Sequence, residues 1–427
     1  MHRPVAPHDA IWLQDSATNL MVINGVFTSD RIDLATVREL FQRRVIQEAG
    51  GRYARFTRRV ERVGGRWYWV DDPTFDIARH IIPAVNPDLG TTEKLRHYVG
   101  AEASRPLPTD RPLWQFQVVE NFEDGGSACV VRLHHCIGDG VALVTVIFHF
   151  MDELNEIAGA PGPAVIVPAA GAPRSRFIRM LQIPLAAPGI LLRRLLWFPD
   201  RHALHGPKVS GQKQVAWTAP LDLQVVKDIK NRLGATVNDV LMAAVTGALS
   251  RYIEHQAGEI VERLRISMPV SVRPAQASIT LENRFAAVPL ELPAGISHAR
   301  ERVAAVKLRM DALKQSVVPI VIYGIQSALL MVLPQVVSRG LIDFLANKCT
   351  AVVTNVPGPQ RGLSLAGRRV RTLMFWVPQR ADIGVGISIL SFAGKVQIGV
   401  ISDTRVVPDP VDLVHAFEEE LDALKAL

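Results

Sequence analysis

The spacing of apolar residues predicts a mixture of helices and strands in the first third of the chain. Between residues 30 and 49, apolar residues recur every three or four positions, which is typical of an amphipathic helix. Residues 91–104 and 141–158 predict two further helices. Runs rich in β-branched and aromatic residues predict strands at 66–70, 114–122 and 127–135. The Glu-Asp-Gly-Gly turn between the last two runs predicts a hairpin.

The same alternation of patterns returns in the second half of the chain. Strands are predicted at 263–273, 349–359, 371–378, 384–392 and 395–403. Helices are predicted at 220–234, 235–255, 298–316 and 409–427. Because both halves carry strands and helices of their own, the pattern predicts two mixed units rather than one repeated motif.

Residues 161–215 interrupt this pattern and divide the chain. The segment begins rich in proline, alanine and glycine, as linkers are, and continues with large apolar residues and several arginines. The arginines concerned are Arg174, Arg176, Arg179, Arg193 and Arg194. Two interpretations remain: a crossover helix between domains, or a basic amphipathic element that touches anionic lipid. We therefore expect a first domain at 1–160, a linker or crossover at 161–215, and a second domain at 216–427.

Composition narrows the class of protein. The chain has 427 residues, of which 48% are hydrophobic and 21% charged, as in a globular protein with a large core. The net charge of +7 indicates an anionic partner, or only serves solubility. Basic residues do not interleave with aromatic ones, so we expect no nucleic-acid partner. The three cysteines lack the spacing of a disulfide framework, and the N-terminus lacks the pattern of a signal peptide, which predicts a cytoplasmic protein.

One apolar segment raises the question of a membrane. Residues 316–338 carry no charge and are long enough to span a bilayer. Pro319, Gly324, Gln326 and Pro334 interrupt the segment, however. We therefore expect a helix that is buried in the domain or lies on its surface, with an interfacial helix as the alternative.

The most distinctive polar residues end a predicted strand at His134 and His135. Successive side chains on a strand point to opposite faces, so both rings bind one metal ion only if the strand has already ended. No other cluster of ligands completes such a site, and we expect no metal. His135 shares its face with Leu133, Val131 and Cys129, and burial there favours the neutral imidazole that a general base requires. His134 is expected to be structural. The alternative for both is an ordinary core histidine.

The residues after the histidine pair form a glycine-flanked turn. Asp139 is predicted either to orient the His135 imidazole, as a carboxylate does in a triad, or to pair with an arginine and fix the loop. Gly138 and Gly140 are predicted to allow a positive φ and a close approach of the backbone to a substrate. The chain has no Gly-x-Ser-x-Gly nucleophile, so the predicted chemistry is direct attack by a bound alcohol or amine that His135 deprotonates.

These residues carry a resemblance to a known superfamily. The pattern HHxxxDG, formed by His134, His135, Asp139 and Gly140, resembles the signature of the CoA-dependent acyltransferases. Four further stretches narrow the resemblance: Pro112-Leu113-Trp114, Asn238-Asp239, residues 268–273, and residues 354–359 with Asn355, Pro357 and Gly358. Together, and nearly end to end, they resemble the bacterial wax ester synthase/acyl-CoA:diacylglycerol acyltransferase family. The chain departs from the family pattern at residues 21–26 and at Glu282, which precedes Asn283 where the family has glycine.

The resemblance implies an α/β fold of two chloramphenicol acetyltransferase-like domains, each a mixed sheet flanked by helices, with a tunnel between them. It implies transfer of a long-chain acyl group from acyl-CoA, without any cofactor, to a fatty alcohol or a diacylglycerol. His135 would be the base, and the protein would work at a membrane or lipid-droplet surface. The alternatives are an acyltransferase that takes its acyl group from a carrier protein, and a non-catalytic lipid-binding protein on this fold.

The resemblance also suggests supporting roles for the remaining motif residues. Asn238 is the candidate donor to the oxyanion, because Thr236 and Asp239 predict a capping box that places Asn238 in the first turn of a helix. The alternative is that Asn238 and Asp239 only cap this helix. Trp114 is expected to pack in the core at a strand start rather than to act in catalysis. Asn355, Pro357 and Gly358 are expected to shape a turn near the domain boundary.

Overall fold

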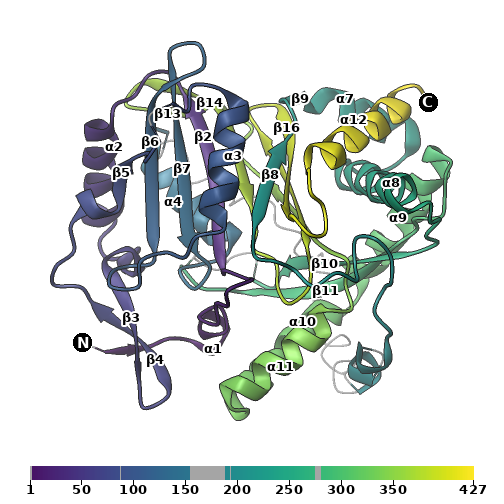
Figure 1. Ribbon diagram of the computed structural model, residues 1–427, viewed down its shortest axis with the longest axis horizontal. Helices are drawn as coiled ribbons and strands as arrows, with labels where there is room; N and C mark the ends of the chain where they lie inside the picture. The colour runs from purple at the N-terminus through teal and green to yellow at the C-terminus, as the bar shows by residue number, and fades with distance from the viewer. Residues whose placement is uncertain (1, 87, 154–187, 193, 275–279) are drawn as a thin grey trace.

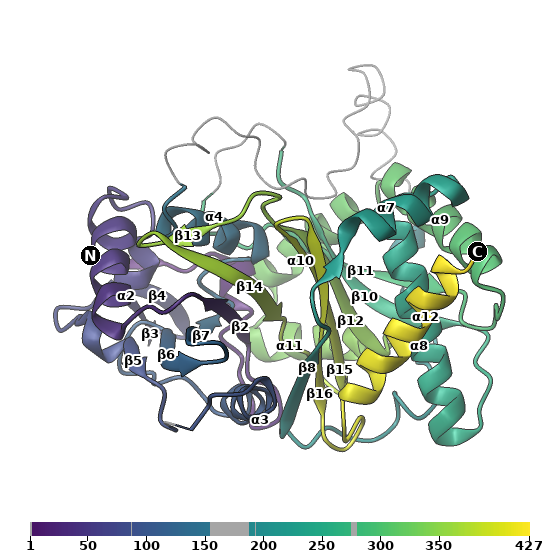
Figure 2. The same ribbon diagram turned by 90° about the horizontal axis from the view of Figure 1, so that it is seen from above.

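Two mixed sheets, each flanked by helices, form the body of the molecule and meet along a seam (Figure 1). The computed structural model describes residues 2–86, 88–153, 188–192, 194–274 and 280–427. This architecture confirms the predicted fold class. The chain starts on the side of the first sheet and ends beside the helices of the second (Figures 1 and 2).

The first sheet has six strands in the order β13-β14-β2-β7-β6-β5. Their bounds are β2 (Val22–Ser29), β5 (Ile81–Pro83), β6 (Trp114–Phe122), β7 (Gly126–His134), β13 (Ser364–Leu365) and β14 (Arg368–Trp376). The helices of this unit are α1 (Pro7–Ala10), α2 (Leu34–Phe41), α3 (Thr92–Ala103) and α4 (Gly140–Phe150). A small sheet joins β1 (Arg3–Pro4), β3 (Arg58–Val63) and β4 (Arg66–Asp71). The predicted hairpin is confirmed, because β6 and β7 pair antiparallel.

The second sheet has seven strands, six of them in the order β11-β10-β12-β15-β16-β8, with β9 paired to β16. Their bounds are β8 (Lys213–Trp217), β9 (Leu221–Asp222), β10 (Leu264–Ser271), β11 (Phe285–Leu292), β12 (Ala351–Pro357), β15 (Val385–Phe392) and β16 (Lys395–Asp403). The helices are α7 (Leu223–Leu233), α8 (Val237–Ala257), α9 (Ala299–Gln315), α10 (Val318–Val332), α11 (Gln335–Ala346) and α12 (Val411–Lys425). The apolar faces of α8 and α12 and of the strands form one large core.

Two strands, β13 and β14, cross from the second half of the chain into the first sheet. The boundary at residue 216 assigns residues 371–378 to the second domain, but β14 lies beside β2 (Figure 2). The two strands pair antiparallel, with Phe375 opposite Gly25. Trp376 and Met374 are buried there with Val26. The local pattern of apolar residues predicts a strand but does not specify which sheet the strand joins. The sequence-based boundary therefore assigned residues 371–378 to the wrong unit. The seam is therefore closed by hydrogen bonds of the backbone as well as by side chains.

The structure describes the end of the predicted linker and all of the apolar segment 316–338. β8 begins at Lys213, inside the predicted linker, and belongs to the second sheet. Residues 316–338 form α10 and the start of α11, with a break at Leu333 and Pro334. Among the described residues, no single helix is both long and apolar enough to cross a bilayer, and the bent pairs α7–α8 and α9–α10 reach that limit only together. Residues 161–187 lie outside the described residues.

The close contact between α3 and β8 predicts that a glycine-to-alanine substitution in α3 destabilises the protein. A methyl group at Gly100 would lie 2.9 Å from the carbonyl oxygen of Lys213, whereas one at Gly340 in α11 would meet nothing within 4 Å. Gly100→Ala should therefore lower the free energy of unfolding by about 1–3 kcal/mol. The matched control Gly340→Ala should raise it by roughly 0.5–1 kcal/mol, because alanine favours the helix. Urea unfolding measures both; equal stabilisation by both variants would contradict this packing of α3 on β8.

Candidate active site

The histidine pair lies at the seam end of β7, between the two neighbouring strands of the first sheet. The backbone N–H of His134 donates to the carbonyl of Leu113 at 2.9 Å, and that of His135 donates to the carbonyl of Met21 at 2.7 Å. Both side chains are buried. Hydrogen bonds to both neighbouring segments thus fix the backbone here. The two rings lie in different surroundings, as expected when successive side chains of a strand point to opposite faces.

His134 is held in a polar contact and points away from the candidate chemistry. Its Nε2 lies 2.9 Å from Oδ2 of Asp15, and its Nδ1 accepts from the backbone N–H of Cys136 at 3.2 Å. Burial opposes a charge on this ring, but Cys136 and the Asp15 carboxylate raise the pKa of His134 overall. Asp15 also accepts from the backbone N–H of Met21. His134 therefore fixes the segment before β2 against the turn, which fits its predicted structural role.

His135 is packed against an aromatic ring instead of a carboxylate. Its imidazole stacks on Trp12 with ring centroids 3.8 Å apart and an angle of 11° between the planes. Nδ1 of His135 is buried and has no hydrogen-bond partner among the described residues. Burial lowers the pKa of His135 to about 4, although Asp139 acts in the opposite direction. The ring is therefore neutral at physiological pH, in agreement with the prediction for this face of the strand.

Asp139 fixes the loop and does not hydrogen-bond to the histidine ring. Its carboxylate pairs with the buried guanidinium of Arg273, and it accepts from the backbone N–H of Arg284 at 2.9 Å. The other oxygen caps α4 by accepting from the backbone N–H of Ala142 at 3.1 Å. Of the two predicted roles, pairing with an arginine is the one observed. The partner comes from the end of β10, more than a hundred residues away in the chain.

The two glycines of the turn do not behave as predicted. Neither Gly138 nor Gly140 has a positive φ. A methyl group on Gly138 would lie 3.3 Å from Cβ of Ala142, and one on Gly140 would lie 3.7 Å from Val356. Gly140 is the first residue of α4, and Asp139 before it has the extended conformation of an N-cap. The expectation of left-handed backbone is wrong because the tight turn lies earlier, at His134–Ile137, and the two glycines follow it where α4 begins.

A second buried carboxylate ties the histidine turn to the second unit. The side-chain N–H groups of Asn283 donate to the carbonyl of His135 and to Asp9 Oδ1, both at 2.8 Å. Asp9 also pairs with Arg55 at 2.7 Å, and Arg55 donates to the carbonyls of Cys136 and Ile137. Asn283 was predicted, but Asp9 and Arg55 were missed. Nothing in the sequence near Asp9 indicates that its partner lies beyond residue 280.

Asn238 lies where the capping pattern placed it. The predicted capping box is confirmed: the N–H of Thr236 donates to Asp239, and the N–H of Asp239 donates to Thr236. Oδ1 of Asn238 accepts from the side chain of Asn355 at 2.8 Å, while its Nδ2 is buried without a partner among the described residues. Asn355 thus orients the Asn238 amide and leaves an N–H donor available.

The remaining motif residues pack the fold around the site. Trp114 is fully buried, donates to the carbonyl of Phe56 at 2.8 Å and stacks on His80, as expected for a core residue. Leu113 accepts from His134, and Pro112 precedes it at the start of β6. Pro357 ends β12. A side chain on Gly358 would collide with the carbonyl oxygen of Ser391, so the backbones there require glycine.

Two apolar cavities flank the turn. The first, which we call the seam cavity, has a volume of about 180 Å³ and is bordered by His135, Trp12 and Asn283 together with residues of β10, β11, α10 and α11. The second, the α4 cavity, has a volume of about 90 Å³ and lies between Leu143 of α4, Val356 and strands of the first sheet. Gly140 borders the α4 cavity, so the turn separates the two spaces. The described residues contain no group of three His, Cys, Asp or Glu side chains that could hold a metal ion.

Two family models match the chain. The model described as the wax ester synthase/diacylglycerol acyltransferase catalytic domain matches residues 9–196, which include the histidine turn. The WS/DGAT C-terminal domain matches residues 281–425, which include Asn283 and Asn355. Among curated proteins, "Probable diacylglycerol O-acyltransferase tgs1" of Mycobacterium tuberculosis is 28% identical over 396 residues, covering 84% of this chain and 81% of that protein.

Solved structures share the fold. The wax ester synthase/diacylglycerol acyltransferase from Marinobacter aquaeolei VT8 superposes with a TM-score of 0.72 at 22% identity and covers 99% of both chains. The first condensation domain of the calcium-dependent antibiotic synthetase gives a TM-score of 0.63 at 15% identity, over 100% of this chain and 96% of that one. At these identities the likeness concerns the arrangement of the two sheets and their helices.

The position of Asp139 predicts a large loss of stability when its charge is removed. Asp139→Ala leaves the guanidinium of Arg273 buried without a counterion and leaves two backbone N–H groups unpaired, which should cost about 3–5 kcal/mol. Urea unfolding measures the loss. Asp110→Ala, which removes an exposed carboxylate paired with Arg79, serves as the control and should unfold like the wild type. An Asp139→Ala protein as stable as the wild type but inactive would assign Asp139 to the chemistry instead.

Proposed function

The chain belongs to the wax ester synthase/diacylglycerol acyltransferase family and is an acyltransferase, and we propose that it transfers a long-chain acyl group from acyl-CoA to the hydroxyl of a fatty alcohol or a diacylglycerol. The observation that carries the proposal is the position of the His135 ring, which is buried from solvent, is neutral and borders the seam cavity. A neutral imidazole at the wall of an apolar cavity is suited to take a proton from a lipid hydroxyl.

The proposed reaction needs one base and one donor to the oxyanion. His135 accepts the proton of the acceptor hydroxyl while that oxygen attacks the thioester carbonyl carbon. The tetrahedral intermediate collapses as its C–S bond breaks, and the thiolate of CoA takes the proton back from His135. Asn238 is the proposed donor to the oxyanion, because its unpaired Nδ2 is buried and oriented by Asn355. Stacking on Trp12 keeps the His135 ring in one orientation.

The two cavities suggest separate places for the two substrates. The walls of the α4 cavity are almost entirely apolar, which suits the hydrocarbon chain of the acyl group. The seam cavity contains His135 and Asn283 as well as apolar side chains, which suits an acceptor with a hydroxyl group and a long chain. The turn from His135 to Gly140 lies between them, so the thioester would be held beside the base.

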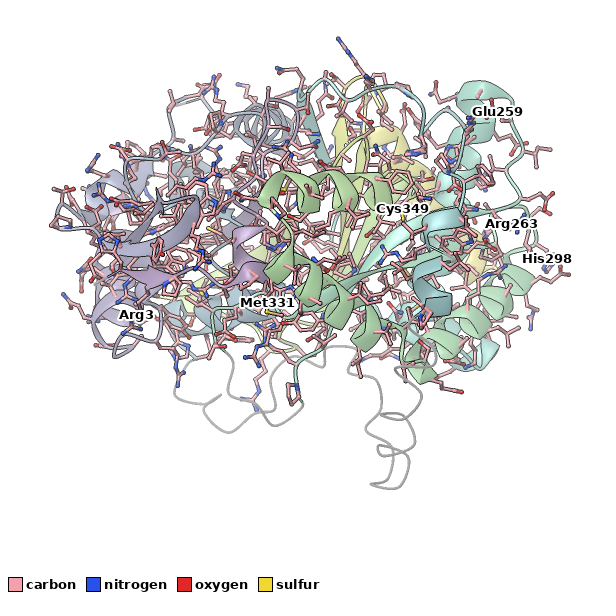
Figure 3. The ribbon with its side chains drawn as sticks, turned by 90° about the horizontal axis from the view of Figure 1, so that it is seen from below. Arg3, Glu259, Arg263, His298, Met331 and Cys349 are labelled. Atoms are coloured by element: carbon pink, nitrogen blue, oxygen red, sulfur yellow. The ribbon has the colours of Figure 1, made fainter. Side chains whose placement is uncertain are left out.

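Exposed apolar side chains next to the seam cavity support an interfacial role. α10 and α11, which border this cavity, expose Met331, Val332, Val336, Val337 and Phe344 to solvent. Figure 3 shows the two helices on one face of the molecule, with Met331 near their edge. Leu192, Leu195, Leu196 and Phe198 are also exposed. We propose that this apolar surface inserts into a membrane or lipid droplet, from which the acceptor passes into the seam cavity.

Of the arginines predicted to strengthen membrane binding, only Arg194 lies within the described residues. Arg174, Arg176, Arg179 and Arg193 lie outside the described residues. Arg194 is partly buried and borders the seam cavity, so it is not a surface charge. The proposal for the membrane therefore rests on the apolar side chains of α10 and α11, with any attraction to anionic headgroups as a contribution that salt would screen.

Substitution of the two histidines tests the assignment of the base. With palmitoyl-CoA and hexadecanol or dioleoylglycerol, His135→Ala should lower the rate of free thiol release by at least 100-fold, because general base catalysis contributes roughly 100- to 10,000-fold. His134→Ala should lower it less, since this ring contacts Asp15 rather than the cavity. Circular dichroism confirms that both variants are folded. Equal activities of the two folded variants would refute His135 as the base.

Vesicle flotation tests the membrane surface. Val332→Glu combined with Val336→Glu places two charges on side chains that are 79% and 81% exposed, and should weaken binding to phosphatidylcholine vesicles several-fold without loss of stability. The matched control combines Val85→Glu and Ile260→Glu, which are 71% and 77% exposed but lie outside α10 and α11. If both double variants float like the wild type, α10 and α11 do not form the membrane surface.

A further inference from the structure

The wall of the seam cavity contains a cation that has no counterion. Arg194 is partly buried and borders the cavity beside Leu191 and Cys349. Among the described residues, no carboxylate lies within ion-pair distance of Arg194, and no hydrogen bond holds its guanidinium. The other arginine of the cavity, Arg380, differs, because it pairs with Asp343 at 2.7 Å.

A second cation lies close behind Arg194. Lys348 is buried in the connection between α11 and β12. It immediately precedes Cys349, which is labelled in Figure 3. Its ammonium group donates to the carbonyls of Leu195, at 2.8 Å, and Trp197. No carboxylate of the described residues pairs with Lys348 either. Asp200, which accepts from the side chain of Thr350, is already engaged by Arg265 at 2.8 Å. This corner of the cavity therefore has an excess of positive charge.

The excess charge is unfavourable in the empty protein. Burial lowers the pKa of Arg194, and burial together with repulsion from Arg265 and Arg194 lowers the pKa of Lys348. Partly desolvated cations gain most from an anion that brings its own hydrogen-bond acceptors. An anionic group in the seam cavity would be that missing partner for Arg194.

We propose that Arg194 binds the carboxylate of a long-chain fatty acid, whose hydrocarbon chain lies in the seam cavity among Ile322, Leu329 and Leu345. A planar guanidinium binds a carboxylate through two parallel hydrogen bonds. Arg194 is the only cation without a counterion that borders this cavity among the described residues, so the site supplies one charge for a monoanion. A phosphate carries more charge and would call for more than one such group at the cavity wall.

The proposal has a consequence for regulation, and in this respect it rests on the proposed function. If the acceptor lipid occupies the seam cavity, then a fatty acid bound at Arg194 excludes it. Free fatty acid would therefore inhibit transfer in competition with the alcohol and not with acyl-CoA. Fatty acid would thus slow ester formation when it accumulates unactivated.

Equilibrium binding tests the proposal without reliance on transfer. A fluorescent long-chain fatty acid is bound to the full chain carrying His135→Ala and is displaced by palmitate or by the neutral 1-hexadecanol. Adding Arg194→Gln should weaken palmitate binding at least tenfold and change 1-hexadecanol binding less than twofold. Arg194→Lys, which keeps the charge, should recover part of the palmitate affinity. Arg201→Gln, an exposed arginine outside the cavity, is the matched control and should leave both affinities unchanged.

Two other results would overturn the proposal. If Arg194→Gln weakens palmitate and 1-hexadecanol equally, Arg194 only shapes the cavity. If it weakens the binding of palmitoyl-CoA and leaves the affinity for palmitate unchanged, the anion bound there is a phosphate of the acyl donor. If Arg194→Gln abolishes palmitate binding and the wild-type protein shows no transfer at all, the anion site is supported while the proposed function is refuted.

Discussion

Two buried carboxylates, Asp9 and Asp139, hold the turn that follows β7 against the second half of the chain. Asp139 pairs with Arg273 at the end of β10, and Asp9 accepts from Asn283 just before β11. A buried ion pair seldom adds much net stability compared with apolar packing, but it is costly to break, because a lone buried charge remains. These contacts therefore fix one relative position of the two sheets at the point where the candidate base lies.

The burial of the candidate site depends on these contacts, which close the seam between the two sheets. Because the seam is closed around it, His135 is 5% exposed, stacks on Trp12 and stays neutral. The unfolded chain binds a proton at this histidine more readily than the folded chain does, so folding stability falls as the pH drops from about 6.5 toward 4. The same closure leaves an apolar cavity on each side of the turn. A protected base between two apolar spaces is what transfer between two lipid substrates requires.

Local features of the site could be predicted from the sequence, and long-range ones could not. The strand end at His134 and the capping box of Asp239 depend on neighbours within a few residues. The partners that Asp9, Asp139 and β14 find across the seam are Asn283, Arg273 and β2; each lies more than a hundred residues away, and no local pattern specifies it. The positive φ predicted for Gly138 and Gly140 is wrong because the reverse turn lies a few residues earlier, at His134–Ile137, and α4 begins at Gly140.

The most direct test of the central claim is the ionisation of His135 in the folded protein. Nuclear magnetic resonance of protein with isotope-labelled histidine, assigned with His135→Ala, follows the ring through a pH titration. A ring buried at the closed seam should remain neutral at pH 5.5 and above and titrate near a pKa of about 4. A wild-type pKa near 6.5 would contradict the account, because His135 would then be solvated and the seam would not be closed around it.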